Sequence, residues 1–228
     1  MLFRSRPSES YVPVVPTRKG QQQLEIDFDA TGERIESNQM INDIRTSVSL
    51  WRSRNYPGVT QVTRKLLQYW ANEERENRML FCQREAAETA IFLGECDKRE
   101  FRPHIDEFNV QYNEGLPRIA LKMATGTGKT VVFGMLIAWQ TINKVRAPHD
   151  KKFAKRFLIV APGITIRDRL RVLRPSDDEN YYKMRDLVPV DLWGDLQQAQ
   201  IAITNYQDRK STRLNSSHEW ISRMPSSA

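Results

Sequence analysis

The run Thr125-Gly-Thr-Gly-Lys-Thr130 constrains the fold more than any other feature, because it stands between an apolar stretch and a helical pattern. A strand is predicted from Arg118 to Met123, and a helix from about Lys129 to Asn143. Gly126 and Gly128 have no Cβ, so the loop can wrap an anion with its N–H groups pointing inward. The positive end of the helix dipole favours the same anion. A strand, a glycine loop and a helix in this order predict a phosphate-binding loop.

The loop's side chains indicate which groups of a nucleotide it holds. Lys129 is expected to reach the β- and γ-phosphates of ATP, and Thr130 is expected to place its hydroxyl on Mg²⁺. Thr125 and Thr127 complete the predicted nucleotide-binding residues. The usual loop has a glycine five positions before its last glycine, where this chain has Met123.

A glutamine upstream of the loop is the candidate for recognising the base. Gln83 carries an amide that can read an adenine edge, because it offers a donor and an acceptor side by side. Phe81 and Arg84 stand near it in the sequence and could pack against the base. Gln83 is therefore predicted to bind adenine; a solvent-facing glutamine at a helix start is the alternative.

Two later segments predict that the chain has an α/β fold with a parallel sheet. Phe157 to Ala161 is a continuous apolar run, and Gln200 to Thr204 is a further strand candidate. Strands that alternate with helices predict right-handed crossovers. Ligands of such sheets gather at the carboxyl ends of the strands. Thr165, Arg167 and Thr204 stand there and are predicted to hold a nucleic-acid phosphate, whereas a helix cap beginning at Thr165 with solvated arginines is the alternative.

The part of the chain before the loop is predicted to be mainly helical. Residues 6–37 are expected to form an extended arm, with a short edge strand from Gln23 to Asp29. Residues 38–114 are expected to hold four helices, and residues 115–207 an incomplete α/β lobe. Asn38 and Thr60 are the predicted caps of the first two helices. The apolar stripe predicted for the first helix consists of Ile41, Ile44, Val48 and Trp51.

Both ends of the chain resemble translated sequencing adapters. Asp208 to His218 and Ile221 to Ala228 match the reading of one adapter, and Leu2 to Ser5 matches its reverse complement. We therefore expect residues 1–5 and 208–228 to be artefacts and the parent protein to be longer. Removing them lowers the net charge of +7, which weakens the case that charge alone makes for a polyanionic partner.

Composition excludes several classes of protein. Cys82 and Cys96 are the only cysteines, which excludes a disulfide scaffold and a CxxC zinc site and favours a cytoplasmic location. No apolar run approaches the roughly 20 residues of a membrane span. The N-terminus has no signal-peptide core, because its short apolar stretch is broken by proline. We expect no membrane partner.

The segment Leu121 to Thr130, preceded by Phe81 to Ala86, resembles superfamily 2 helicase motors of the DEAD/DEAH type. It is most similar to the restriction subunit of type III restriction-modification enzymes, in which Met at position 123 is familiar. Ile137 to Lys144, Phe157 to Leu173 and Ile201 to Tyr206 resemble the same group.

The resemblance implies that this chain is the N-terminal part of a larger helicase-type motor protein. Residues 115–207 would be an incomplete RecA-like lobe of an ATP-dependent motor that moves on double-stranded DNA and cuts it. ATP and Mg²⁺ would be its cofactors, and a methyltransferase (modification) subunit its partner. The family's nucleotide residues carry over to Gln83, Gly126, Gly128, Lys129 and Thr130. Thr165 and Thr204 carry over as contacts to the DNA backbone.

Several alternatives remain open at this point. A repair or RNA helicase without a nuclease would share every motif described above, and a P-loop kinase or an inactive nucleotide-binding module would share the loop. Asp106-Glu107 has the letters of the helicase DExx segment, but it stands before the phosphate loop and follows no apolar strand, and Asp177 to Glu179 is expected to be a solvated loop. The DExx segment that holds Mg²⁺ is expected to follow the third strand, after Gln207. We therefore expect little or no ATPase activity from this chain alone. We also expect aggregation, because three strands of a larger sheet would leave an unpaired apolar edge.

Overall fold

The computed structural model describes residues 10–11, 36–96, 100–112 and 118–205 of the 228. The chain forms two compact units: Met1–Val59 with Glu85–Lys122, and Thr60–Arg84 with Met123–Ala228. The strand predicted from Gln23 to Asp29 and both adapter-like ends lie outside the described residues. The predicted domain boundaries stay a prediction.

The first unit is helical. Its two short strands, β1 (Ser10–Tyr11) and β2 (Glu36–Ser37), pair antiparallel. Its helices are α1 (Gln39–Ser53), most of α3 (Phe81–Ile91), the π-helical turn Phe92–Cys96 and α4 (Arg102–Tyr112). The four helices predicted for residues 38–114 are therefore present. They are α1, α3 and α4, together with α2 (Gln61–Ala71), which belongs to the second unit.

Helix α1 buries most of its predicted stripe. Ile44, Val48 and Trp51 are buried, whereas Ile41, the first member, is about half exposed. Asn38 occupies the cap position, as predicted, but its side chain makes no capping hydrogen bond to the helix. The cap prediction is thus right about where the helix begins and wrong about what the asparagine side chain does there.

A buried carboxylate fastens α1 to α3 inside the first unit. Glu88 is 2% exposed, and it accepts hydrogen bonds from Arg52 Nε at 2.7 Å and from the Tyr56 hydroxyl at 2.9 Å. Arg45 and Glu85 form a second, half-buried pair with two bonds of 3.2 Å. Because a buried charge is stable only while it is paired, Glu88 and its donors must assemble together.

The chain turns sharply after α1, at Tyr56-Pro-Gly58. Asn55 and Tyr56 have φ values of 59° and 57°, and Gly58 has 84°. These left-handed values reverse the chain after α1, and non-glycine residues rarely adopt them. Trp51 Nε1 donates to the Pro57 carbonyl at 2.8 Å, which ties the turn back to the helix.

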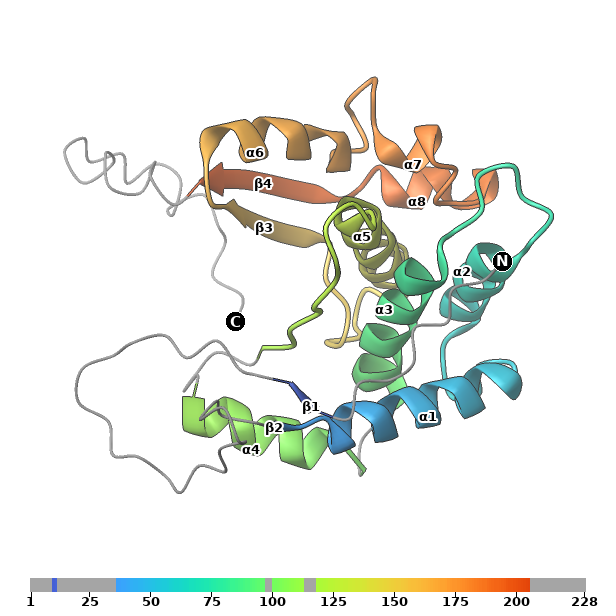
Figure 1. Cartoon of the computed structure of the whole chain (residues 1–228). Coiled ribbons are helices and arrows are strands. Elements are labelled where there is room, and N and C mark those ends of the chain that lie inside the picture. Colours follow the sequence, from blue (N-terminus) through green and yellow to red (C-terminus); the bar gives the residue numbers. More distant parts are fainter. Residues whose placement is uncertain (1–9, 12–35, 97–99, 113–117, 206–228) are drawn as a thin grey trace. The chain divides into compact units, whose positions relative to one another are not determined.

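The second unit contains the parallel sheet. Its strands are β3 (Arg156–Ala161) and β4 (Gln200–Asn205), paired in parallel with Phe157 opposite Ile201. Helix α6 (Ile164–Arg169) runs back alongside both strands (Figure 1). The remaining helical segments of this unit are α2 (Gln61–Ala71), α5 (Lys129–Arg146), the 3₁₀ turns Leu170–Leu173 and Val190–Leu192, α7 (Tyr181–Met184) and α8 (Trp193–Leu196).

The sheet confirms the predicted fold class, a partial α/β lobe of the RecA type, with one correction. Arg118 to Met123 was expected to be a strand, but these residues have no regular secondary structure, and Ile119 is 47% exposed. A strand exists only where a neighbour pairs with its backbone, and within the described residues no strand pairs with this stretch. The described sheet therefore has two strands instead of three, and Leu158 and Val160 remain exposed on one face.

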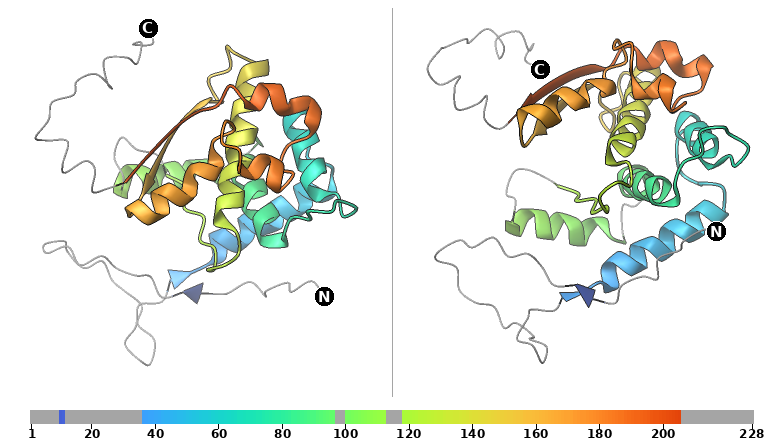
Figure 2. Two further views of the ribbon diagram at one scale, coloured as in Figure 1. Left: turned by 90° about the horizontal axis from the view of Figure 1, so that it is seen from above. Right: turned by 45° about the horizontal axis from the view of Figure 1, so that its top comes forward.

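Helix α5 is the core of the second unit. It is surrounded by α2, α7, α8 and the Leu170–Leu173 turn (Figure 2). Its apolar side chains are buried on several faces, as expected of a helix enclosed in a core. Those buried are Val131, Val132, Met135, Ile137, Ala138, Trp139 and Ile142.

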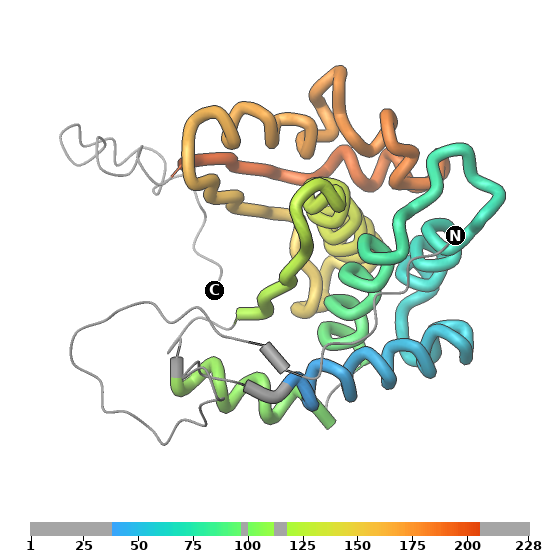
Figure 3. Tube along the Cα trace, viewed as in Figure 1, coloured from blue at the N-terminus to red at the C-terminus, as the bar shows by residue number. Residues whose placement is uncertain are grey.

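The second predicted cap, Thr60, is confirmed. Its hydroxyl accepts a hydrogen bond from the Thr63 backbone N–H at 3.0 Å, at the start of α2. The same hydroxyl lies 2.5 Å from Asn143 Oδ1 near the end of α5. Beyond α2, the chain takes a wide loop to α3 (Figure 3). The cap therefore starts α2 and also fixes it to α5.

Replacing Glu88 with alanine is expected to destabilise the chain by about 3–5 kcal/mol, because Arg52 is left without its buried partner. Urea unfolding followed by circular dichroism measures this. Arg102→Ala is the matched control: it breaks an exposed pair with Asp106, worth about 0.5 kcal/mol or less. Equal losses in the two variants would contradict the buried-pair interpretation.

Candidate functional site

The glycine loop begins after the irregular stretch and ends where α5 starts. Gly126 and Gly128 both have φ +80°, a left-handed conformation that glycine adopts without steric penalty. A Cβ built on Gly126 would meet no atom within 4 Å. This glycine therefore borders open space. The loop lies, as predicted, directly before an 18-residue helix, at the positive end of its dipole.

Two side chains of the loop converge on one backbone carbonyl. Lys129 Nζ donates to the Ala124 oxygen at 2.8 Å, and the Thr127 hydroxyl donates to the same oxygen at 2.7 Å. Lys129 is exposed, and Thr130 lies beside it in the first turn of α5. An ammonium group and a threonine hydroxyl at a helix N-terminus suit a phosphate and Mg²⁺ respectively. The residues present therefore fit both groups.

Gln83 lies outside the loop in the sequence but is hydrogen-bonded to it. Its Nε2 donates to the Thr127 carbonyl at 3.0 Å, and its Oε1 accepts from the Leu80 N–H at 3.0 Å. These bonds leave the amide one N–H and one oxygen lone pair, the pair that a bidentate contact with adenine requires. Gln83 is only 7% exposed. Its predicted role as an adenine reader stays a prediction, and its contact with the loop is a finding that the sequence did not indicate.

Gly128 must be glycine for a second reason besides its backbone angle. A Cβ at this position would collide with Nε2 of Gln83. The missing side chain leaves the space into which the Gln83 amide reaches. Gly128 and Gln83 therefore form one packing unit at the base of the loop.

The residues predicted to contact DNA lie at the carboxyl end of the sheet. Ala161 and Asn205 end the two strands opposite each other. Thr204 lies in β4 and is partly buried, whereas Thr165 and Arg167 lie in α6, which contacts both strands. Arg167 Nε is 3.1 Å from the neighbouring carboxylate of Asp168.

The alternative prediction that Thr165 caps a helix is wrong. The cap position of α6 belongs to Gly163, and no side chain makes a capping hydrogen bond there. Thr165 is inside the helix and exposed. The glycine backbone makes the turn itself, so the threonine one residue into the helix is left facing solvent.

Sequence reasoning missed the groups that shape the loop, because they belong to the backbone. The Ala124 carbonyl, the Thr127 carbonyl and the Leu80 N–H each take part in the hydrogen bonds described above. Every residue has a carbonyl, so no residue type marks these positions. Of the features that shape the loop, only its two glycines, Gly126 and Gly128, could be recognised in the sequence.

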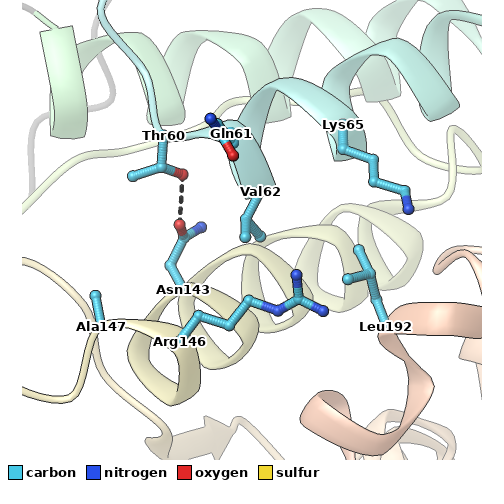
Figure 4. A pocket seen from close by; sticks show the side chains of 8 residues that line it. All are labelled: Thr60, Gln61, Val62, Lys65, Asn143, Arg146, Ala147 and Leu192. Carbon is cyan, nitrogen blue, oxygen red and sulfur yellow. Dashed lines mark hydrogen bonds between the residues drawn. The ribbon is translucent and has the colours of Figure 1, made fainter.

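A cavity of about 430 Å³ lies away from the loop, at the opposite end of α5 (Figure 4). Its cationic side chains are already neutralised: Lys65 lies 2.5 Å from Asp191, and Arg146 lies 2.7 Å from Asp195. Lys65 also lowers the pKa of the Asp191 carboxyl. The lining residues are Thr60, Gln61, Val62, Lys65, Asn143, Arg146, Ala147 and Leu192.

No group of three or more His, Cys, Asp or Glu side chains is placed to hold a metal ion in the described part of the chain. None of the helices within that part is long and apolar enough to cross a membrane.

The parallel sheet, the left-handed glycines and the helix that follows them define a P-loop lobe of the superfamily 2 helicase type. The sequence model of the family described as type III restriction enzyme, res subunit, matches residues 60–222. The chain belongs to this family. Helicase-type domains of the family are ATP-dependent. No curated protein and no solved structure matches the chain.

Gly128→Ala is expected to destabilise the chain more than Gly126→Ala. Each substitution places alanine at a left-handed φ, which costs about 1–2 kcal/mol. Only the Cβ at position 128 also displaces Gln83, which adds the loss of a buried hydrogen bond, about 1–3 kcal/mol. Thermal unfolding of the two variants measures the difference, and equal melting temperatures would contradict the packing of Gln83 on Gly128.

Proposed function

We propose that this chain binds ATP together with Mg²⁺ at the glycine loop, as the nucleotide-binding lobe of a motor that acts on double-stranded DNA. The observation that carries the proposal is the loop itself. Its two left-handed glycines lead directly into α5, and Lys129 and Thr130 occupy the first turn of that helix. Membership of a family of ATP-dependent helicase-type domains supports the same function.

Each residue of the loop has a role in this proposal. The N–H groups between Thr125 and Gly128 surround the phosphates, and the helix dipole stabilises their charge. Lys129 leaves the Ala124 carbonyl and pairs with the β- and γ-phosphate oxygens. Mg²⁺ would supply charge neutralisation, held in part by the Thr130 hydroxyl. Gln83 stays on the loop and presents its remaining N–H and lone pair to adenine.

Lys129→Ala is expected to weaken ATP binding by about 10- to 100-fold, because a charged hydrogen bond contributes about 1.5–3 kcal/mol. Isothermal titration calorimetry with Mg²⁺ measures the affinity. Lys151→Ala removes an exposed lysine in the turn after α5 and is the matched control, with no expected change. A folded wild-type chain that binds no ATP would overturn the proposal.

The carboxyl end of the sheet is proposed to grip the DNA backbone through Thr165, Arg167 and Thr204. The hydroxyls and the guanidinium can donate to phosphate oxygens, which positions DNA without reading its sequence. The sheet supports this assignment because α6, which carries Thr165 and Arg167, begins three residues after β3 ends and contacts β4, in which Thr204 is the next-to-last residue. The carboxyl end is also where ligands of parallel sheets gather.

Arg167→Ala is expected to lower DNA affinity equally for unrelated sequences and to reduce the slope of log affinity against log salt by about 1. Fluorescence anisotropy with two duplexes at several salt concentrations measures both effects. Arg102→Ala is the control, because Arg102 also pairs with an aspartate near it in the sequence. An unchanged salt slope in Arg167→Ala would remove this residue from the interface.

The biological setting is proposed to be DNA restriction in the cytoplasm, with ATP-driven movement on DNA, cleavage by a nuclease domain and a methyltransferase subunit as partner. The family description supports restriction over repair or RNA metabolism. Co-purification of the full-length protein with a methyltransferase, together with ATP-dependent cleavage of plasmid DNA, tests this setting. DNA unwinding without cleavage would favour the repair alternative.

A further inference from the structure

A long connection joins α2 to the segment that carries Gln83. Residues 72–80 have no helix or strand and form the wide loop seen in the chain trace (Figure 3). Among the twelve described residues from Asn72 to Gln83, only Arg75 and Gln83 are buried. Arg75 is therefore the buried side chain of residues 72–80, and Gln83 is a buried side chain in the first turn of α3, where the connection ends. One of them, Gln83, is already bonded to the phosphate loop.

Arg75 makes the other attachment. Its guanidinium donates to the backbone carbonyl of Asp186 and lies 3.2 Å from the Asp186 carboxylate. It also stacks on the Tyr69 ring, with 4.3 Å between its Cζ and the ring centroid. The Arg75 side chain is only 5% exposed. A guanidinium at this depth is stable only while these acceptors stay in place.

Tyr69 completes the arrangement from α2. Its hydroxyl donates to the Asp186 carboxylate at 2.5 Å. Burial and this hydrogen bond raise the pKa of Tyr69 to about 12, so the hydroxyl keeps its proton at neutral pH. Asp186 has φ +51°, a left-handed angle that aspartate tolerates better than most residues. Tyr69 and Asp186, the two partners of Arg75, are thus also hydrogen-bonded to each other.

The turn that carries Asp186 is anchored on the helix that follows the phosphate loop. Leu187 is fully buried, and a Cβ added to Gly134 of α5 would come within 2.8 Å of its Cδ1. Trp70 Nε1 of α2 donates to the Leu187 carbonyl at 2.8 Å. The turn is therefore fixed to both α2 and α5, and it offers Arg75 a rigid support.

We infer that Arg75, Tyr69 and Asp186 form a clamp that positions Gln83 against the phosphate loop. The clamp fixes one end of an otherwise exposed connection to the framework of α5. Gln83 fixes the other end to the loop at the start of the same helix. The part of the inference that concerns adenine rests on the proposed function, whereas the part that concerns the loop does not.

Opening the clamp should loosen residues 72–80 and the first turn of α3, which carries Gln83, before it unfolds the core, because Arg75 is the buried side chain of residues 72–80. The amides of residues 76–84 and 124–131 should then exchange hydrogen faster. Preference for adenine over guanine should also fall, because the amide that reads the base is no longer held in one place. A residue that only adds stability would change neither the pattern of exchange nor the base preference.

Hydrogen–deuterium exchange on the whole chain tests the clamp without any nucleotide. Arg75→Met keeps a long side chain but removes the hydrogen bonds, and it should speed exchange about tenfold or more in residues 76–84 and 124–131. Arg78→Met, at an exposed position of the same connection, should change nothing. Tyr69→Phe removes one hydroxyl, should give the same pattern more weakly, and is the variant to use if Arg75→Met does not fold.

The ratio of ATP affinity to GTP affinity gives a second readout. Arg75→Met should lower this ratio as much as Gln83→Ala does, and the double variant should lower it no further. Faster exchange spread evenly over the second unit, with an unchanged ratio, would overturn the clamp. If the wild-type chain binds neither nucleotide, the proposed function fails, and the exchange pattern still decides the inference.

Discussion

Burial of α5 is the interaction on which the second unit depends. The helix is apolar over most of its surface and lies within α2, α7, α8 and the Leu170–Leu173 turn. Leu187 packs so closely on Gly134 that a Cβ there would come within 2.8 Å of its Cδ1 and force one of the two to shift. Because neighbours hold the helix on several faces, its first turn has little freedom. The glycine loop therefore ends at a fixed point, and the proposed phosphate site depends on that point being held in place.

The chemistry of the site is carried largely by backbone groups. Two donors meet at the Ala124 carbonyl, and the amide of Gln83 spans from the Leu80 N–H to the Thr127 carbonyl. Side chains contribute a positive charge at Lys129 and a hydroxyl at Thr130, in the first turn of α5. Such a site tolerates variation in many side chains but depends on the backbone angles at its glycines. Met123 stands where the usual loop has its first glycine, and it has no left-handed φ in this structure, so its Cβ causes no backbone strain there.

A local pattern predicted Thr60 as the cap of α2, because a cap hydrogen bond joins residues three apart. The apolar run from Phe157 to Ala161 became β3 because β4, more than forty residues later, pairs with it. The strand expected from Arg118 to Met123 did not form, since a strand needs a paired neighbour. Thr165 did not cap α6, because the backbone at Gly163 already makes the turn.

The sequence by itself determined the glycine loop, the helix that follows it and the family to which the chain belongs. Only the tertiary structure decided which distant groups meet. Gln83 contacts a carbonyl 44 residues away, and Arg75 contacts one 111 residues away. Spacing in a sequence encodes contacts three or four residues apart, because helical turns and caps repeat at that distance. Contacts across a hundred residues depend on how buried surfaces pack, and packing is decided by the whole unit at once.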